Sequence, residues 1–542
     1  MTRIRRTPFV VLLAVLVCAP LTAATRTWTG AASDRWSNPA NWDGSVPVGG
    51  DDLVFPSLGN VVAVSTNDLA PGTMFHSITV NAPSYRIGGN GIVLGAGGLV
   101  LNARFIVSLI HGELKFASIT LADSQTWRGQ GSEFTRLGPT NINGKTLTIT
   151  NAMRLEFESI SGTGAIIDNT QNGFFRSDSS VYVGTLTVNA SQVIIAGGTA
   201  GDVQVNGAGF GGDLPANGPT AWLELSSGNV GNITVSGSAA LSIHGNSGTL
   251  YAAGGLAFLP ATGDPAWFVI PDGAIPVALN VMGKVALGNA LLKVFPSHNS
   301  TFVLIHNQGG DPVAGTFLGL PEGAVFGNGN WVRISYLGGS GNDVTLTPVS
   351  TAFIATSTSV TASVLPSSPG HIVSFTAAVT SAAGTPAGQV SFYDGGIFLG
   401  SSSLDQFGRA ILTTSYEPSS HLFTAAFLGS ETLATSQGSV RVAACVPPIL
   451  TQQPSSQVIL QGQIVTLAVQ ATGTPPLSFQ WYEGSSGNLS KPVLGATSAT
   501  FTPAALTSNA SFWVRVSSDC GAAQSATATI AVRQPRRRSA VH

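Results

Sequence analysis

A three-residue unit, made of an apolar residue, a threonine and a second apolar residue, recurs through the first two-thirds of the chain. Successive side chains of an extended strand point to opposite faces, so each unit places both apolar residues on one face and the threonine on the other. The segment 25–350 alternates in this way in short runs that Gly, Asn and Asp interrupt. The units lie at 78–80, 119–121, 147–149, 186–188 and 233–235.

This pattern predicts an all-β fold. Many short strands, over a region longer than a sandwich usually holds, favour a β-solenoid in which each coil pairs its backbone with the previous coil. Only 9% of the residues are charged, against roughly 25% in an average soluble protein, while the hydrophobic content of 43% excludes disorder. We therefore expect residues 25–350 to form one solenoid with almost no helix, whose two open ends must be capped.

The first 24 residues have the features of a secretory signal peptide. Three arginines precede an apolar run at 9–21, which is too short to span a membrane. Small residues follow, and we expect cleavage after Ala24. The mature protein is thus expected to be secreted or to lie at the cell surface, with no transmembrane segment. Residues 535–542 are expected to be a solvated basic tail.

Two segments at the ends of the region 25–350 carry distinctive patterns. The far segment is 315–349, "GTFLGLPEGAVFGNGNWVRISYLGGSGNDVTLTPV". The first segment carries the spaced residues Trp28, Gly30, Trp36, Asn41, Trp42, Pro47, Asp51 or Asp52, and Phe55. Both segments resemble the ends of bacterial autotransporter-type β-helix passengers. The resemblance implies a surface or secreted β-solenoid, but no membrane barrel follows in this sequence, so self-translocation is not expected.

Residues 351–444 change to longer alternating strands. Val390 and Phe392 are expected to face one way, with Ser391 and Tyr393 facing the other. Asp394-Gly395-Gly396 is a strong hairpin signal. About seven such strands fit an immunoglobulin-like sandwich. The run resembles the group 3 bacterial Ig-like domain, including Gly388, Gly400 and Gly408.

Residues 445–534 resemble a second Ig-like domain, of the kind found in bacterial surface proteins. The resemblance makes Trp481 the core tryptophan, and it places Leu467 and Val514 where other Ig domains carry their intersheet cysteines. Phe512 replaces the corner tyrosine. Removal of the signal peptide leaves two cysteines, and in an exported chain this even count predicts a disulfide between Cys445 and Cys520.

The segment 27–55 allows two interpretations. Trp28, Trp36 and Trp42 can form the core of an N-terminal cap, which we expect, or they can form a sugar-stacking platform. Asp51 and Asp52 follow two glycines and indicate a turn into a strand. The alternative role for the two carboxylates is a metal or sugar ligand.

Two further patterns could carry chemistry. Arg154, Glu156 and Glu158 alternate with apolar residues and share one strand face. Glutamates two apart on a strand lie roughly 7 Å apart, a separation found in inverting glycosidases, although any solvated strand face gives it as well. The stretch 338–343, "GGSGND", matches the start of the calcium-binding nonapeptide repeat. A single copy is equally typical of a hairpin turn, which we expect here.

The sequence contains no H-E-x-x-H, no G-x-S-x-G, no P-loop and no Cys-x-x-Cys. We therefore expect no catalytic residue, no cofactor and no metal ion. The net charge of −2 gives no basis for nucleic-acid binding. The predicted function is that of a noncatalytic structural or adhesive protein, which presents the solenoid on Ig-like spacers to an extracellular glycan or a surface protein. The alternative is a carbohydrate-active or glycan-binding β-helix protein that acts on extracellular polysaccharide.

Overall fold

The computed structural model describes most of the chain from Ala24 to Gln534, and it is nearly all β-structure. The only helix among the described residues is the short 3-10 helix η1 (Pro39–Asn41). In the described part of the chain, no helix is long and apolar enough to cross a membrane. The description leaves out residues 58–62, 83–84, 103–111, 130–133, 152–153, 171–173, 178–179, 183, 190, 208–219, 227, 245–250, 263, 271–278, 295–299, 328–329, 366–370, 417–419 and 444–445.

The chain divides into two compact units. The first consists of residues 1–235, 239–256 and 274–283. The second consists of residues 236–238, 257–273 and 284–542. The fold is the expected one, a β-solenoid followed by two Ig-like sandwiches.

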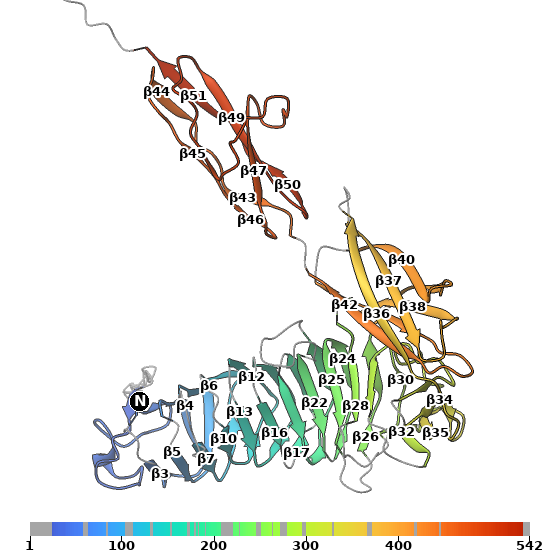
Figure 1. Ribbon diagram of the computed structural model, residues 1–542. Helices are drawn as coiled ribbons and strands as arrows, with labels where there is room; N and C mark the ends of the chain where they lie inside the picture. The colour runs from blue at the N-terminus through green and yellow to red at the C-terminus, as the bar shows by residue number, and fades with distance from the viewer. Residues whose placement is uncertain are drawn as a thin grey trace, which may run out of the picture. The chain divides into compact units, whose positions relative to one another are not determined.

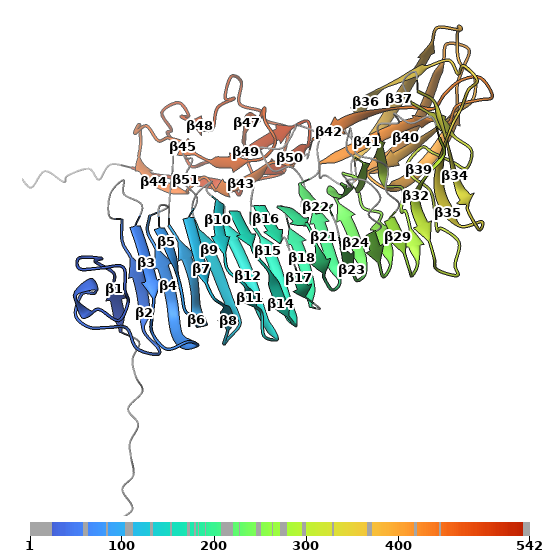
Figure 2. The same ribbon diagram turned by 90° about the horizontal axis from the view of Figure 1, so that it is seen from below.

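In the first unit, each coil contributes strands to three rows of parallel strands (Figures 1 and 2). Thr140, Ile160 and Ser180 are register partners, so these coils are 20 residues long. One row contains β8 (Ile119–Leu121), β11 (Thr140–Asn141), β14 (Ile160–Gly162) and β17 (Ser180–Tyr182). The second row contains β9 (Gln125–Gly129), β12 (Lys145–Asn151), β15 (Gly164–Asn169) and β18 (Thr185–Asn189). The third row contains β5 (Tyr85–Gly89), β7 (Gly112–Phe116), β10 (Phe134–Leu137), β13 (Arg154–Phe157) and β16 (Phe174–Ser177).

The recurring apolar-Thr-apolar units explain why these coils stack. All five units lie in strands, and every one of their apolar residues is buried. The apolar ladders therefore form the interior of the stack, as the alternation predicts. Burial of each such side chain stabilises the fold by about 1.5–3 kcal/mol.

The second unit contains the last strands of the solenoid. There β28 (Trp267–Ile270) pairs in parallel with β31 (Leu291–Val294). The pairing then becomes antiparallel, because β35 (Asp343–Pro348) pairs with both β32 (Phe302–Asn307) and β34 (Val332–Gly338). Strands β34 and β35 of this antiparallel group lie in the segment 315–349, which resembles the end of a passenger solenoid, and β32 precedes it.

The first Ig-like domain, also in the second unit, has two sheets. One has the order β36 (Thr356–Leu365), β37 (His371–Ser381) and β40 (Arg409–Tyr416). The other has the order β39 (Ile397–Ser403), β38 (Gln389–Asp394), β41 (His421–Phe427) and β42 (Ser436–Val442). Val390 and Phe392 are buried in the core between the sheets, as predicted. The predicted hairpin joins β38 to β39.

The second Ig-like domain has its own core around Trp481, which is fully buried. Leu467 and Val514 lie in this core together with Phe512. Leu467 and Val514, which were expected at the positions of the intersheet cysteines of other Ig domains, thus contribute to an apolar core. The largest sheet has the order β44 (Gln457–Leu460), β51 (Ala528–Arg533), β49 (Ala510–Ser518) and β47 (Ser478–Glu483), and β50 (Gly521–Gln524) pairs with β49.

Candidate functional site

The three tryptophans of the first segment fill the interior of the N-terminal coil. Trp28, Trp36 and Trp42 are 1%, 0% and 4% exposed. The ring centroids of Trp28 and Trp42 are 5.1 Å apart, and those of Trp36 and Trp42 are 5.7 Å apart, both edge to face. Phe55 also packs against all three indoles. None of the three rings presents an open face on which a sugar could stack.

Hydrogen bonds fix two of these indoles. Trp36 Nε1 donates to Ser65 Oγ at 2.6 Å, and Trp42 Nε1 donates to the Trp36 carbonyl oxygen at 3.0 Å. The buried Asn41 holds the intervening loop, because its Oδ1 accepts from the backbone N–H groups of Ala32 and Ser33. Buried polar groups in protein interiors generally have hydrogen-bond partners, so these contacts fit a structural role for the segment.

Asp51 and Asp52 are both engaged by their own chain. Asp51 is buried, and its Oδ2 accepts from Arg26 Nε and from the Val48 backbone N–H, both at 3.0 Å. Asp52 Oδ1 lies 2.7 Å from His76 Nδ1 and also accepts from the Ser77 hydroxyl. These contacts fix the turn that leads into β2 (Asp52–Phe55), the first strand after the cap.

The third row of strands carries charges of alternating sign on its outer face. The register places Arg86, Glu113, Arg136, Glu156 and Arg176 opposite one another on successive coils. We call this series the charge ladder. Each Glu lies between two Arg residues, so the ladder compensates its own charge along the stack.

The charge ladder includes one of the two glutamates that resembled a glycosidase pair. Arg136 Nε donates to Glu156 Oε2 at 3.0 Å. Glu158 has a different partner, because Lys115 Nζ lies 3.5 Å from its Oε1. Arg154 lies on the same strand as Glu156. The carboxylates of Glu156 and Glu158 thus pair with different cations on different coils. This arrangement fits a salt-bridged surface better than a catalytic acid–base pair.

The stretch 338–343 forms the hairpin turn between β34 and β35. Asp343 is buried, accepts from the Asn307 backbone N–H at 2.9 Å, and lies 3.0 Å from His306 Nδ1. Its carboxylate therefore fixes a neighbouring strand of the same chain. Among the described residues, no group of three or more His, Cys, Asp or Glu side chains is placed to hold a metal ion.

The cysteine pair stays a prediction. Cys520 is buried at the turn between β49 and β50. Cys445 lies outside the described residues.

Within the second unit, polar contacts join the last solenoid strands to the first Ig-like domain. We call this region the junction. Arg441 Nη2 donates to Asp264 Oδ1 at 2.6 Å, and neither side chain is more than 26% exposed. The hairpin residue Gly396 donates its N–H to the Ala261 carbonyl oxygen and accepts from Asn289 Nδ2, both at 3.0 Å. The Thr435 backbone N–H donates to the Val325 carbonyl oxygen at 2.9 Å.

An apolar cluster and a close backbone approach complete the junction. Tyr393 and Ala426 of the Ig-like domain pack with Leu291 and Leu318 of the solenoid. A Cβ atom on Gly319 would lie only 2.6 Å from the Ala426 Cβ, so glycine is required for this contact. Sequence alternation predicted that Tyr393 faces away from the domain core, but it gave no sign of what Tyr393 contacts.

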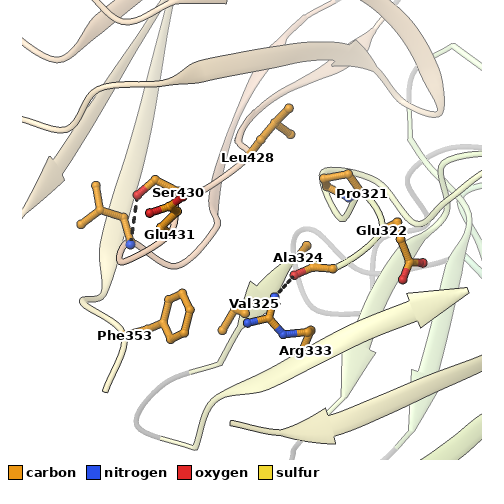
Figure 3. Close-up of a pocket in the computed structure, with 12 residues that line it drawn as sticks. Pro321, Glu322, Ala324, Val325, Arg333, Phe353, Leu428, Ser430 and Glu431 are labelled. Carbon is orange, nitrogen blue, oxygen red and sulfur yellow. Dashed lines mark hydrogen bonds between the residues drawn. The ribbon is translucent and has the colours of Figure 1, made fainter. Parts of the chain in front are cut away.

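A cleft of about 350 Å³ lies at the junction (Figure 3). Its lining includes Glu322, Arg333, Phe353 and Glu431. Arg333 Nη1 donates to the Gly323 carbonyl oxygen at 2.9 Å, and Glu322 Oε2 accepts from the Tyr336 backbone N–H at 2.7 Å. Burial raises the pKa of the Tyr336 phenol, whose hydroxyl donates to the Leu320 carbonyl oxygen. The charged groups Arg333 and Glu322 thus stabilise the segment 315–349 by hydrogen bonds within it.

Two family profiles match the C-terminal part of the chain. Residues 357–444 match the bacterial Ig-like domain (group 3), which confirms the resemblance noted for this part of the sequence. Residues 451–534 match a family described as a domain of unknown function (DUF8696). A search of curated proteins found no match.

Three solved structures with similarity to this chain contain Ig-like or fibronectin-like modules. A three-Ig fragment of titin is 14% identical and covers 32% of this chain and 66% of its own length, with a TM-score of 0.25. The N-terminal Ig1-2 module of the Drosophila receptor protein tyrosine phosphatase DLAR is 13% identical and covers 32% and 98%, with a TM-score of 0.15. The fibronectin(III)-like modules of CbhA from Clostridium thermocellum are 18% identical and cover 34% and 98%, with a TM-score of 0.19.

Proposed function

We propose that this protein is an exported, noncatalytic structural or adhesive protein in which Ig-like domains present a β-solenoid. The observation that carries the proposal is the junction. Its salt bridge, backbone hydrogen bonds and apolar cluster fix the first Ig-like domain to the last solenoid strands. Ig-like domains that present a solenoid must be firmly attached to it. Direct contacts between the two parts give a firmer attachment than a flexible linker does.

The partners of the acidic residues support a noncatalytic role. The candidate acids Asp51, Asp52, Glu156 and Glu158 all bind groups of their own chain. A general acid or base needs a proton position that a substrate can reach. The paired surface of the charge ladder suits repeated contact along the stack, in which many weak contacts add up.

The likeness of the two end segments to autotransporter-type passengers supports an extracellular location, as does the N-terminal sequence. We propose that export uses the first 24 residues and that the mature chain begins at Thr25. The adhesive partner is proposed to be an extracellular glycan or a surface protein.

The test is expression of the full chain in a bacterial host, followed by cell fractionation and N-terminal sequencing. We expect to find the protein outside the cytoplasm with Thr25 as its first residue. Uncleaved protein that stays in the cytoplasmic fraction would contradict export. The purified protein is then incubated with a panel of polysaccharides. We expect retention of polymer without new reducing ends, whereas release of reducing ends would support the carbohydrate-active alternative.

A further inference from the structure

The cleft at the junction is lined by side chains from three different elements (Figure 3). Arg333 lies on β34, near the end of the solenoid. Phe353 lies in the segment that links the solenoid to the first Ig-like domain, and Glu431 lies in the turn between β41 and β42 of that domain. Arg333 and Glu431 are exposed, and Phe353 is half-buried. A solute can therefore reach all three side chains.

The two charged side chains keep unused hydrogen-bonding capacity. A guanidinium group has five N–H donors, and among the described residues Arg333 uses one nitrogen, Nη1, which donates to the Gly323 carbonyl oxygen. The Glu431 carboxylate forms no hydrogen bond or ion pair with any residue that the structure describes. The cleft thus offers donors, acceptors and an aromatic ring to a solute.

Hydrogen bonds fix the walls of the cleft on the side of the Ig-like domain. The Ser430 backbone N–H donates to the Leu433 carbonyl oxygen at 2.9 Å, and the Leu433 backbone N–H donates to Ser430 Oγ at 3.2 Å. The backbone N–H of Ile354, the residue after Phe353, donates to the Thr432 carbonyl oxygen at 2.9 Å. The cleft is therefore preformed, so a ligand would not have to order these segments when it binds.

We propose that the cleft binds one neutral sugar unit of an extracellular glycan. Its volume of about 350 Å³ lies at the lower end of the range for small-molecule sites, about 300–1,000 Å³, and suits a single sugar ring better than a long polymer segment. The apolar face of the ring matches Phe353, while the hydroxyl groups match the donors of Arg333 and the acceptors of Glu431. This inference rests on the proposed adhesive function, for which it names a site.

The charges that line the cleft favour a neutral sugar over an acidic one. The carboxylates of Glu322 and Glu431 face a single guanidinium group, that of Arg333. Glu322 is held in the wall, because its Oε2 accepts from the Tyr336 backbone N–H at 2.7 Å. An acidic sugar would bring a further carboxylate into this cleft, and like charges in close contact oppose binding. A neutral sugar meets no such repulsion.

The test measures binding of the full-length protein to neutral hexaoses of glucose, mannose and galactose by calorimetry, with hexagalacturonate as the acidic counterpart. We expect saturable binding of at least one neutral hexaose and at least about tenfold weaker binding of hexagalacturonate. Absence of binding to every neutral hexaose, or tighter binding of the acidic one, would overturn the proposal. Tighter binding of hexalysine than of any sugar would also overturn it, because the carboxylates would then serve a cationic partner.

Matched variants locate the site. Glu431→Ala is expected to weaken binding of the neutral hexaose at least about fivefold, while Glu483→Ala, at an exposed position outside the cleft, leaves it unchanged. Phe353→Ala is expected to weaken binding by a similar factor, with Phe407→Ala, at an exposed phenylalanine of the same Ig-like domain, as its control. Circular dichroism melts confirm folding, and Phe353→Leu, which keeps apolar bulk without a ring, replaces Phe353→Ala if that variant unfolds.

Failure of the site can be told apart from failure of the proposed function. If the wild-type protein and all variants bind a neutral hexaose equally, glycan adhesion stands but the cleft is not its site. If the protein is exported but retains no polysaccharide and binds no hexaose, both the glycan partner and the assignment of the cleft are wrong.

Discussion

The solenoid and the second Ig-like domain both bury tryptophans and carry arginines, but the two regions differ in the hydrogen-bond partners that these side chains have. In the N-terminal coil, Trp36 and Trp42 donate their N–H groups to partners within the coil. In the charge ladder, Arg136 has a carboxylate partner. In the second Ig-like domain, Trp513 Nε1 and Arg515 Nε have no partner among the described residues. The buried indoles of both regions contribute to apolar packing, but only those of the N-terminal coil also contribute hydrogen bonds to described residues.

The largest expected effect comes from emptying the N-terminal coil. Trp42→Ala should lower the free energy of unfolding by about 3–5 kcal/mol, because it leaves a cavity among Trp28, Trp36 and Phe55. Chemical denaturation of the purified protein measures the change. Leu494→Ala, at a fully exposed position, should change it by less than about 0.5 kcal/mol. A Trp42→Ala protein of wild-type stability would mean that the three indoles are not the core of a cap.

A matched pair of substitutions tests the role of the indole N–H directly. Trp36→Phe and Trp513→Phe each remove an indole from a fully buried position. Of these two indoles, only that of Trp36 has a hydrogen bond to a described residue, the buried Ser65. We expect Trp36→Phe to be the more destabilising by roughly 1–3 kcal/mol in denaturation experiments. Equal losses in the free energy of unfolding would mean that the indole N–H contributes no more to stability in the N-terminal coil than in the second Ig-like domain.

A third prediction concerns the buried carboxyl group of Asp168 inside the solenoid. Burial raises its pKa, and hydrogen bonds from Ser191 and Thr170 offset this only in part. Between the unfolded pKa of about 3.9 and the raised folded value, the folded state binds more protons. The free energy of unfolding should therefore fall as pH rises through this window, by up to about 1.4 kcal/mol per pH unit.

Denaturation curves at a series of pH values check this sign. Asp168→Asn should remove that part of the pH dependence, and Asp123→Asn, at an exposed position, should leave it in place. A wild-type profile that rises through the same window, and that Asp168→Asn flattens, would show that the carboxylate is the favoured form.

The smallest effect is expected from the charge ladder. Arg136 and Glu156 are both partly exposed, so Arg136→Ala should cost only about 0.2–1 kcal/mol, and less at high salt. Arg515→Gln, which breaks no ion pair among the described residues, should cost no more than this. A larger loss for Arg515→Gln would indicate that Arg515 has a structural partner.

The strand pattern predicted much of the fold because alternation reports directly on burial. It located the interior of the coils and the hairpin at Asp394-Gly395-Gly396. The resemblance to Ig-like domains, rather than the alternation, identified the core residue Trp481. The same alternation places Trp513 on the face of β49 opposite the domain core, yet Trp513 is fully buried, which alternation alone did not predict.

The charge ladder and the junction could not be read from the sequence. The ladder depends on which residues of successive coils are register partners, and the irregular coil lengths hide this pairing. The junction depends on side chains far apart in the chain, such as Asp264 and Arg441. Alternation within a strand says which face a residue occupies, but not which distant element packs against that face.

One measurement tests the contrast between the two regions most directly. The protein contains nine tryptophans, and hydrogen exchange of their indole N–H groups can be followed by ¹⁵N-resolved NMR, with Trp36→Phe and Trp513→Phe used to assign two of the signals. We predict that the hydrogen-bonded indole N–H of Trp36 exchanges more slowly than that of Trp513, although both side chains are fully buried. Equal or slower exchange at Trp513 would contradict the contrast between the two regions.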